Sequence, residues 1–312
     1  MTSSRGRAVA PAQMLIDCIS DLRAFVAVIE HGGVSAASRH LGRSIQSVSR
    51  SLAAVERAVG TELVRRTTRS SSATSAGAAL YRRVAGALSE IDQASAEAAG
   101  ARDRPLGVLR VSAPPGFAPV FVVPVVAAYL AANPQVDVEL KLEERYVDLV
   151  NEGHDLAVRI GAMPDSSLKT RRLGGIRNVT FAAPSYLAER GRPTHPRDLA
   201  SHACIIRSAA RDPGSWTYAI DGELASFAVA GPFRTNNTDA ATRAAAEASG
   251  IANGPYWNVR PMLDDGSVEL VLSEFEPPAI PVHAVWPATA QVPAKTRLFV
   301  DQLAAHLKRQ QL

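Results

Sequence analysis

The chain has 312 residues, of which 46% are hydrophobic and 21% charged. This is an ordinary globular composition with material for about two or three domains. The only cysteines, Cys18 and Cys204, cannot build a disulfide framework or a thiolate metal site, which indicates a reducing compartment. No run reaches transmembrane length and the N-terminus lacks the apolar core of a secretory signal, so we expect a cytoplasmic protein without a membrane partner.

The positive charge is concentrated in the first third of the chain. Residues 1–104 hold fourteen Arg and no Lys against nine acidic residues, whereas the rest of the chain is nearly neutral. A basic N-terminal segment on a neutral body indicates a polyanionic partner for that segment. On charge alone, a solvated basic face is an equal alternative.

Residues 1–19 are expected to be a disordered extension, and three helices are predicted after them. An apolar stripe through Leu22, Phe25 and Ile29 predicts the first helix. Ser35 is the expected N-cap of a short second helix that stops at Gly42. Ser44 is the expected N-cap of the third. Two short helices joined by so brief a turn predict a helix-turn-helix.

The third helix exposes polar groups on one face. With Val48 and Leu52 turned inward, Gln46, Ser47 and Arg50 fall on the opposite side near the N-terminal end. A recognition helix presents this end to the major groove, where such side chains pair with base edges or phosphates. A polar solvent face on a three-helix core is the alternative.

The segment after the third helix is rich in Arg and Thr. Residues 63–69 and the Ser-rich turn that follows predict a small two-stranded wing whose cations lie along phosphates. The candidate DNA-binding residues of the region are Ser35, Arg43, Ser44, Gln46, Ser47, Arg50, Arg65, Arg66, Thr67, Thr68 and Arg69.

These residues carry a family resemblance. The run Leu22-Arg23-Ala24-Phe25, the segments 33–38 and 44–50, and Arg65-Arg66-Thr67-Thr68-Arg69 resemble the winged helix-turn-helix of LysR-type transcriptional regulators. The resemblance implies a DNA-binding head over residues 20–74. Many members have Gln-Pro-Ala after the Ser, whereas this chain has Ile45-Gln46-Ser47. The resemblance therefore implies that this face of the third helix contacts DNA, but it implies no particular base.

A long helix is predicted next, in a linker over residues 75–104. Its apolar positions are spaced like the seam of a coiled coil, which implies a partner helix and a homodimer. The candidate dimer residues are Leu80, Val84, Ala87, Ile91 and Ala94. A helix buried against its own chain is the alternative. The resemblance further implies a dimer of dimers, that is, a homotetramer.

Residues 105–312 alternate predicted strands with predicted helices, which indicates an α/β domain with parallel strands and crossover helices. The strands are expected at 108–112, 136–142, 155–160, 178–183, 216–220 and 282–286, and the helices at 119–130, 147–151, 239–249 and 293–307. A chain that crosses to a second α/β lobe and returns predicts a cleft between two lobes.

This domain resembles the effector-binding domain of the same family, itself similar to a periplasmic solute-binding protein. The matching pieces include segments 109–114, 155–161, 183–187 and 236–238. The candidate effector-binding residues are Ser112, Gly116, Phe117, Arg145, Tyr146, Arg159, Asn236, Thr238, Tyr256 and Trp257. The aromatic residues suggest a bulky or planar small molecule, and the arginines suit a carboxylate. As alternatives, Arg159 pairs with Asp155 or Asp239, Asn236 only makes a turn, and Trp257 is core.

The sequence holds no catalytic constellation, clustered metal ligands or phosphate-binding glycine loop, so we expect no enzyme, metal or cofactor. The predicted function is sequence-specific binding of double-stranded DNA, controlled by a small-molecule effector that alters oligomer geometry. The alternatives are a solute-binding or transport module and an architectural DNA-binding protein without an effector. The effector, the target genes and the sign of regulation do not follow from the sequence.

Overall fold

The computed structural model describes residues 19–66, 71–98, 104–145, 148–149, 152–163, 168–208, 212–288 and 292–312. The chain forms two compact units, residues 1–104 with 148–153, and residues 105–147 with 154–312. Within these described ranges, no helix combines the length and the apolar character needed to cross a membrane.

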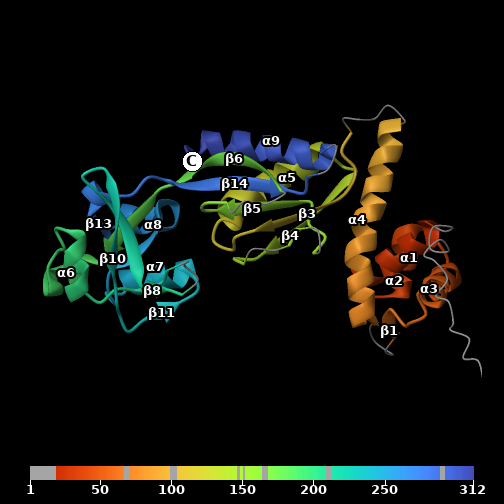
Figure 1. The fold of residues 1–312 in the computed structure, drawn as a ribbon, viewed down its shortest axis with the longest axis horizontal. Helices are drawn as coiled ribbons and strands as arrows, with labels where there is room; N and C mark the ends of the chain where they lie inside the picture. The colour runs from red at the N-terminus through yellow and green to blue at the C-terminus, as the bar shows by residue number, and fades with distance from the viewer. Residues whose placement is uncertain are drawn as a thin grey trace, which may run out of the picture. The chain divides into compact units, whose positions relative to one another are not determined.

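The first unit contains the three predicted helices, the wing and the linker helix (Figure 1). Its elements are α1 Ile19–Glu30, α2 Val34–Leu41, α3 Ile45–Val59, β1 Val64–Arg66, β2 Ser71–Ala73 and α4 Ser75–Ala98. Strands β1 and β2 pair antiparallel, with Arg65 opposite Ser72. The predicted helix-turn-helix with a two-stranded wing is therefore confirmed.

Local chemistry explains most of the helix boundaries in the head. Ser44 caps α3 by accepting a hydrogen bond from the Ser47 backbone N–H at 3.2 Å, and Gly42 ends α2 in the left-handed region. The N-cap prediction for Ser35 is wrong. Helix α2 begins at Val34 because the carbonyl of Gly33 already accepts the Ala37 N–H, so Ser35 lies inside the first turn.

The core of the head forms where the three helices meet. Phe25, Val48 and Leu52 are fully buried, as the apolar periodicity predicts. Burying each such side chain contributes roughly 1.5–3 kcal/mol. The carboxylate of Glu56 accepts hydrogen bonds from the backbone N–H groups of Leu63 (2.9 Å) and Val64 (3.2 Å), which ties α3 to the start of the wing.

Helix α4 packs against its own head over part of the predicted dimer seam. Leu80 is partly buried against the core of the head, and the Tyr81 hydroxyl donates to Glu30 Oε1 at 3.0 Å. Arg23 pairs with Asp92 further along the helix. Leu80 therefore packs within its own chain, which is the alternative that the sequence left open for this helix. Ile91 is 39% exposed.

The other seam positions differ in exposure. Ala87 is exposed and Val84 half-buried, and the side chain of Ala94 lies outside the described residues. The seam remains a prediction at Ile91 and its neighbours.

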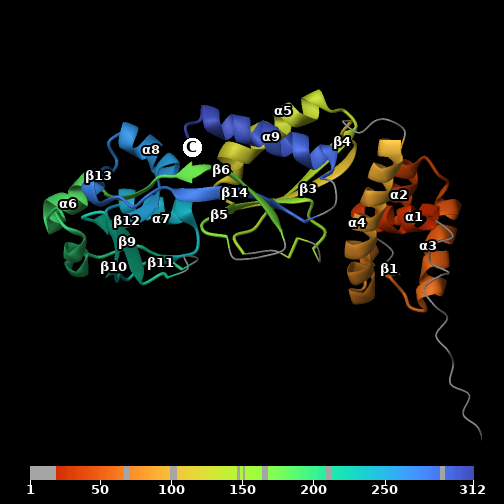
Figure 2. The same ribbon diagram turned by 45° about the horizontal axis from the view of Figure 1, so that its top comes forward.

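The second unit holds two lobes. The first lobe is built from β3 Gly107–Ala113, α5 Val123–Ala132, β4 Val136–Leu142, β5 Leu156–Ile160, β6 Lys169–Ile176, β14 Ile280–Trp286 and α9 Ala294–Arg309. A π-helical turn, Ala118–Val122, precedes α5. Helices α5 and α9 contact each other and lie over the five-stranded sheet (Figure 2). The predicted helix at 147–151 falls largely outside the described residues.

The sheet of the first lobe is mixed. Its order is β4-β3-β5-β14-β6, with β3 parallel to β4 and β5, and β14 antiparallel to β5 and β6. The prediction of parallel strands is right for β3, β4 and β5 and wrong for β14. Strand β6 was not predicted from the sequence, and it pairs antiparallel with β14. These two strands connect the lobes, so they run in opposite directions.

The second lobe surrounds a three-stranded antiparallel sheet, ordered β12-β7-β13. Its elements are β7 Asn178–Ala182, α6 Pro184–Arg190, β8 Ile206–Arg207, β9 Ser215–Ile220, β10 Glu223–Ala228, β11 Arg234–Thr235, α7 Thr238–Ala246, β12 Ala252–Pro255, α8 Tyr256–Asp264 and β13 Glu269–Val271. The two faces of β7 pack in two different cores. Val179 and Phe181 pack in one core with α7 and α8, whereas Ala182 packs in the other core with α6 and β9.

Candidate functional site

The N-terminal part of α3 presents the polar face predicted from the sequence. Gln46 and Arg50 are exposed and Ser47 is half-buried, while Val48 and Leu52 are fully buried on the opposite side. The capped N-terminus of this helix also carries a partial positive charge. The face can therefore offer hydrogen-bond donors and acceptors to a polyanionic duplex.

Arg43 lies in the turn before α3 and contacts three serines. Its Nε and Nη2 donate to the Ser47 hydroxyl at 3.2 and 2.8 Å, and Nη2 also donates to the Ser51 hydroxyl at 2.8 Å. Its Nη1 donates to the carbonyl and the hydroxyl of Ser20 at 3.2 and 3.1 Å. Sequence reasoning placed Arg43 at the DNA surface, but nothing in its spacing indicated the contacts with Ser20 and Ser51.

The remaining candidates of the head are only partly described. The Ser44 hydroxyl is engaged as the cap of α3, and Arg65 is exposed on β1. The side chain of Arg66 and the residues Thr67, Thr68 and Arg69 lie outside the described residues.

In the second unit, the structure brings two effector-site candidates together. Ser112 and Arg159 lie on the adjacent parallel strands β3 and β5, with exposed fractions of 0% and 5%. Arg159 Nη2 donates to the Ser112 hydroxyl at 3.1 Å, and Nη1 donates to the Val158 carbonyl. Arg159 thus contacts Ser112 instead of the predicted alternatives; Asp155 pairs with Lys295 at 3.0 Å.

Aromatic residues form a contact between the two lobes. The ring of Trp257, in α8, lies edge-on to Phe117 and Phe121 of the first lobe, with ring centroids 5.7 and 5.5 Å apart. The indole Nε1 of Trp257 is buried and has no hydrogen-bond partner among the described residues. Leaving a buried donor unpaired costs roughly 1–3 kcal/mol. A ligand with an acceptor group would recover this energy.

The turn after β3 approaches the start of α7. A Cβ added at Gly116 would lie 4.0 Å from the side chain of Thr238, the first residue of α7. The backbone N–H groups of Phe117 and Ala118 both donate to the Pro114 carbonyl, so these two donors are not open to an anion. Asn236 is exposed beside the cap of α7.

Two other candidates have partners that sequence reasoning missed. Arg145 is 59% exposed at its side chain and pairs with Glu143 at 3.3 Å. Tyr256 lies under the guanidinium of Arg177, 4.6 Å from the ring centroid, and Arg177 also forms a bidentate pair with Glu276. Glu276 is 99 residues from Arg177, and no local pattern reveals such a pair. Tyr146 lies outside the described residues.

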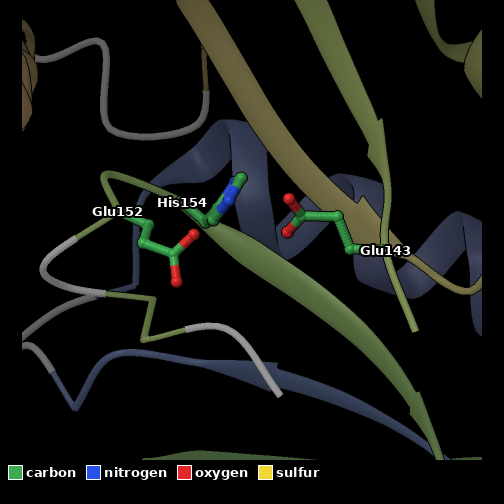
Figure 3. Close-up of side chains that lie close together, drawn as sticks. All are labelled: Glu143, Glu152 and His154. Carbon is green, nitrogen blue, oxygen red and sulfur yellow. The ribbon is translucent and has the colours of Figure 1, made fainter. Parts of the chain in front are cut away.

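A histidine and a glutamate meet near the end of β4. Glu143 and His154 offer ligand atoms within 4.8 Å of each other (Figure 3). Glu152, also drawn there, belongs to the other compact unit. Within one unit the pair supplies two ligands, fewer than the three or four protein ligands of known zinc sites, and one Glu143 oxygen already accepts from Arg145. We assign no metal to it.

The N-terminal head and the C-terminal domain each match a known protein family. Residues 19–78 match the bacterial regulatory helix-turn-helix protein, lysR family, and residues 102–308 match the LysR substrate binding domain. The chain is a LysR-type transcriptional regulator. The resemblance inferred from the sequence is therefore confirmed across the head and the second unit of this regulator, including its winged helix-turn-helix.

Curated relatives of this LysR-type regulator are themselves transcriptional regulators. It is 31% identical over 294 residues to the probable HTH-type transcriptional regulator LtrA of Klebsiella pneumoniae, covering 93% of this chain and 95% of the relative. It is 32% identical to the HTH-type transcriptional regulator PtxR of Pseudomonas aeruginosa, covering 94% of both chains.

Solved structures agree with the architecture. The LysR-type transcriptional regulator CrgA from Neisseria meningitidis is 27% identical, with a TM-score of 0.59, and the match covers 92% of this chain and 98% of that one. The Vibrio cholerae virulence activator AphB is 25% identical, with the same TM-score and coverage.

Proposed function

We propose that α3 is the recognition helix of this regulator and reads DNA through Gln46, Ser47 and Arg50. One observation carries the proposal: Gln46 and Arg50 are exposed near the helix N-terminus, directly opposite the buried Val48 and Leu52. Packing of the apolar side against the head fixes the direction in which the polar side faces.

Each side chain suits a different target on a duplex. A Gln amide pairs with the adenine edge through two hydrogen bonds, and an Arg guanidinium pairs with guanine or a phosphate. Arg65 on the wing, with Arg66, Thr67, Thr68 and Arg69 beside it in the sequence, supplies contacts to the phosphate backbone. The wing thus provides affinity and α3 provides sequence preference.

We further propose that the second unit binds a small effector beside Ser112, Arg159 and Trp257. A buried guanidinium favours a carboxylate or a similar anion. The unpaired indole N–H of Trp257 favours a hydrogen-bond acceptor, and the rings of Phe117 and Phe121 favour a planar apolar group. The proposed ligand class is a small aromatic or otherwise planar carboxylate.

Effector binding between the lobes would act on DNA through the oligomer. Residues that meet across the lobes, such as Trp257 with Phe117, respond to a change in lobe position. A ligand that binds one lobe arrangement more tightly shifts the population toward it. In a dimer joined through α4, such a shift changes the spacing of the two recognition helices and the bend that they impose.

The DNA-binding proposal is tested by gel shift on the duplex immediately upstream of the regulator's own gene. We expect Arg50→Ala to weaken binding about tenfold, the lower part of the range for loss of one base contact. Arg190→Ala is the matched control, because it removes the same charge from an exposed helix of the second unit. Equal affinity of Arg50→Ala and Arg190→Ala would refute the recognition role of α3.

The effector proposal is tested by thermal shift with benzoate as a probe planar carboxylate. We expect benzoate to raise the melting temperature of the wild type, and Trp257→Phe to reduce this rise. Trp216→Phe is the control, because Trp216 packs in the separate core of the second lobe. If both variants respond to benzoate as the wild type does, the ligand does not use the Trp257 N–H.

A further inference from the structure

Arg43 has a complete set of hydrogen-bond partners within the head. A guanidinium carries five N–H donors in a fixed planar fork. The five hydrogen bonds from Arg43 to Ser20, Ser47 and Ser51 assign one acceptor to each donor. A direct hydrogen bond from Arg43 to a phosphate would therefore require one of these contacts to break.

The three partners belong to two different helices. Ser20 lies at the start of α1, whereas Ser47 and Ser51 lie one turn apart on α3. Ser51 is 4% exposed and faces the interior of the head. Arg43 thus links the beginning of α1 to the first two turns of α3, and it holds the segment that carries Gln46 and Arg50.

The same contacts determine what Ser47 can offer to DNA. A hydroxyl has two acceptor lone pairs and one O–H donor. Arg43 Nε and Nη2 both donate to the Ser47 oxygen, which occupies both lone pairs. Ser47 has no described hydrogen-bond acceptor for its own O–H, so this hydroxyl can act toward a base only as a donor.

We propose that Arg43 is a positioning residue that leaves the Ser47 hydroxyl able only to donate a hydrogen bond. It thereby excludes cytosine at the base position that Ser47 faces. In the major groove, guanine, adenine and thymine each present an acceptor, whereas cytosine presents only its N4 amino donor. A free serine hydroxyl could accept from that amino group. This inference rests on the proposed recognition role of α3, and it replaces the predicted direct contact of Arg43 with DNA.

The test compares Arg43→Lys with the wild type on duplexes selected by the wild-type chain from a random-sequence library. Lysine keeps the charge but lacks the planar fork with five donors. We expect Arg43→Lys to bind the selected duplex about tenfold more weakly, with an unchanged dependence of affinity on salt. A direct phosphate contact predicts near wild-type binding by Arg43→Lys, and for Arg43→Ala a salt slope reduced by about 0.9.

Base preference supplies a readout that a loss of rigidity would not produce. Selections repeated with Arg43→Lys and with Ser47→Ala are expected to lose discrimination against cytosine at the same single position, while preferences at other positions remain. Ser51→Ala, which removes a buried acceptor that cannot reach DNA, should weaken binding about threefold and relax that position too. Retained discrimination in Arg43→Lys overturns the proposal.

Controls separate this inference from the proposed function. Arg57→Lys makes the same exchange in the last turn of α3 and should match the wild type. Thermal unfolding and binding to a mixed-sequence duplex show whether each variant retains a folded head. If the wild type binds DNA and Arg50→Ala weakens it while Arg43→Lys does not, only the role of Arg43 fails. If Arg50→Ala has no effect, the recognition role of α3 itself fails.

Discussion

Arg159 donates a hydrogen bond to Ser112 over 3.1 Å from the neighbouring strand of the first lobe, and both side chains are almost fully buried. A buried cation is stable only where polar groups replace its lost hydration. Ser112 is one such group, and the Val158 carbonyl is another. The two residues that the sequence suggested for ligand binding therefore also contribute to the polar structure of the lobe.

We expect Ser112→Ala to destabilise the second unit by about 1–3 kcal/mol, because the change removes an acceptor from a buried charged donor. The melting temperature of that unit should fall by at least about 2 °C. Scanning calorimetry of the full chain measures the shift. Ser226→Ala, on the exposed face of β10, is the matched control. A transition identical to that of the wild type would show that the Ser112 hydroxyl is dispensable.

Ile91 and Leu80 are expected to behave differently when replaced by Asp. Ile91→Asp places a charge at a partly exposed position of the proposed dimer seam, so the oligomer mass should decrease while the head unfolds as in the wild type. Leu80→Asp should destabilise the head, because Leu80 packs against its core. Light scattering and thermal unfolding of both variants measure the two effects. An unchanged mass for Ile91→Asp argues against a seam on α4.

Stability of the second unit should fall as the pH drops below about 6.5. Burial lowers the pKa of His202, and the nearby charge of Asp198 opposes this only in part. Burial also lowers the pKa of His306, with Arg309 acting in the same direction. The unfolded chain therefore takes up these protons at a higher pH than the folded chain, which favours unfolding as the pH falls from the unfolded value through the folded ones.

Urea midpoints at pH 7.5 and pH 5.5 measure this dependence. His202→Gln should reduce the difference between the two midpoints, and the double change with His306→Gln should reduce it further. If the double variant loses as much stability on acidification as the wild type, these two histidines are not responsible.

Cys204 should be chemically inert in the folded protein. Burial raises the pKa of its thiol to about 12, so little of the reactive thiolate exists near neutral pH. In a Cys18→Ser background, iodoacetamide at pH 8 should label Cys204 only after urea unfolding. Mass spectrometry gives the labelled fraction. Rapid labelling without urea would mean that the core around Cys204 opens readily.

Much of the head was predictable because its determinants are local. The cap at Ser44, the left-handed Gly42 and the spacing of Val48 and Leu52 all act within a few residues. The start of α2 was misplaced because Ser is a common N-cap residue, so Ser35 suggested a later start. In the structure the extended backbone of Gly33 precedes the helix, without a side-chain cap. The contact of Arg43 with Ser20 was missed because Ser20 is 23 residues away.

The second unit was less predictable because its pairings are remote in sequence. Alternating apolar patterns predicted the strands β3, β4 and β5. The periodicity of a strand does not indicate its neighbours, so it could not predict that β14 lies between β5 and β6, antiparallel to both. Short strands such as β8 and β11 have only two residues each and carry no pattern of their own. The contact between Trp257 and Phe117 likewise depends on how the lobes meet.

The position of β14 has a consequence for biosynthesis. Strand β14 lies between β5 and β6 in the sheet of the first lobe, but it is synthesised more than a hundred residues after β5. Helix α9 follows β14 in the chain. Because a chain emerges from the ribosome in order, the second lobe has all its strands before the first lobe can close. A nascent chain arrested before Ile280 would therefore leave β5 as an open sheet edge and β6 without its partner strand in the described sheet. Such an edge is a template for aggregation and a target for chaperones.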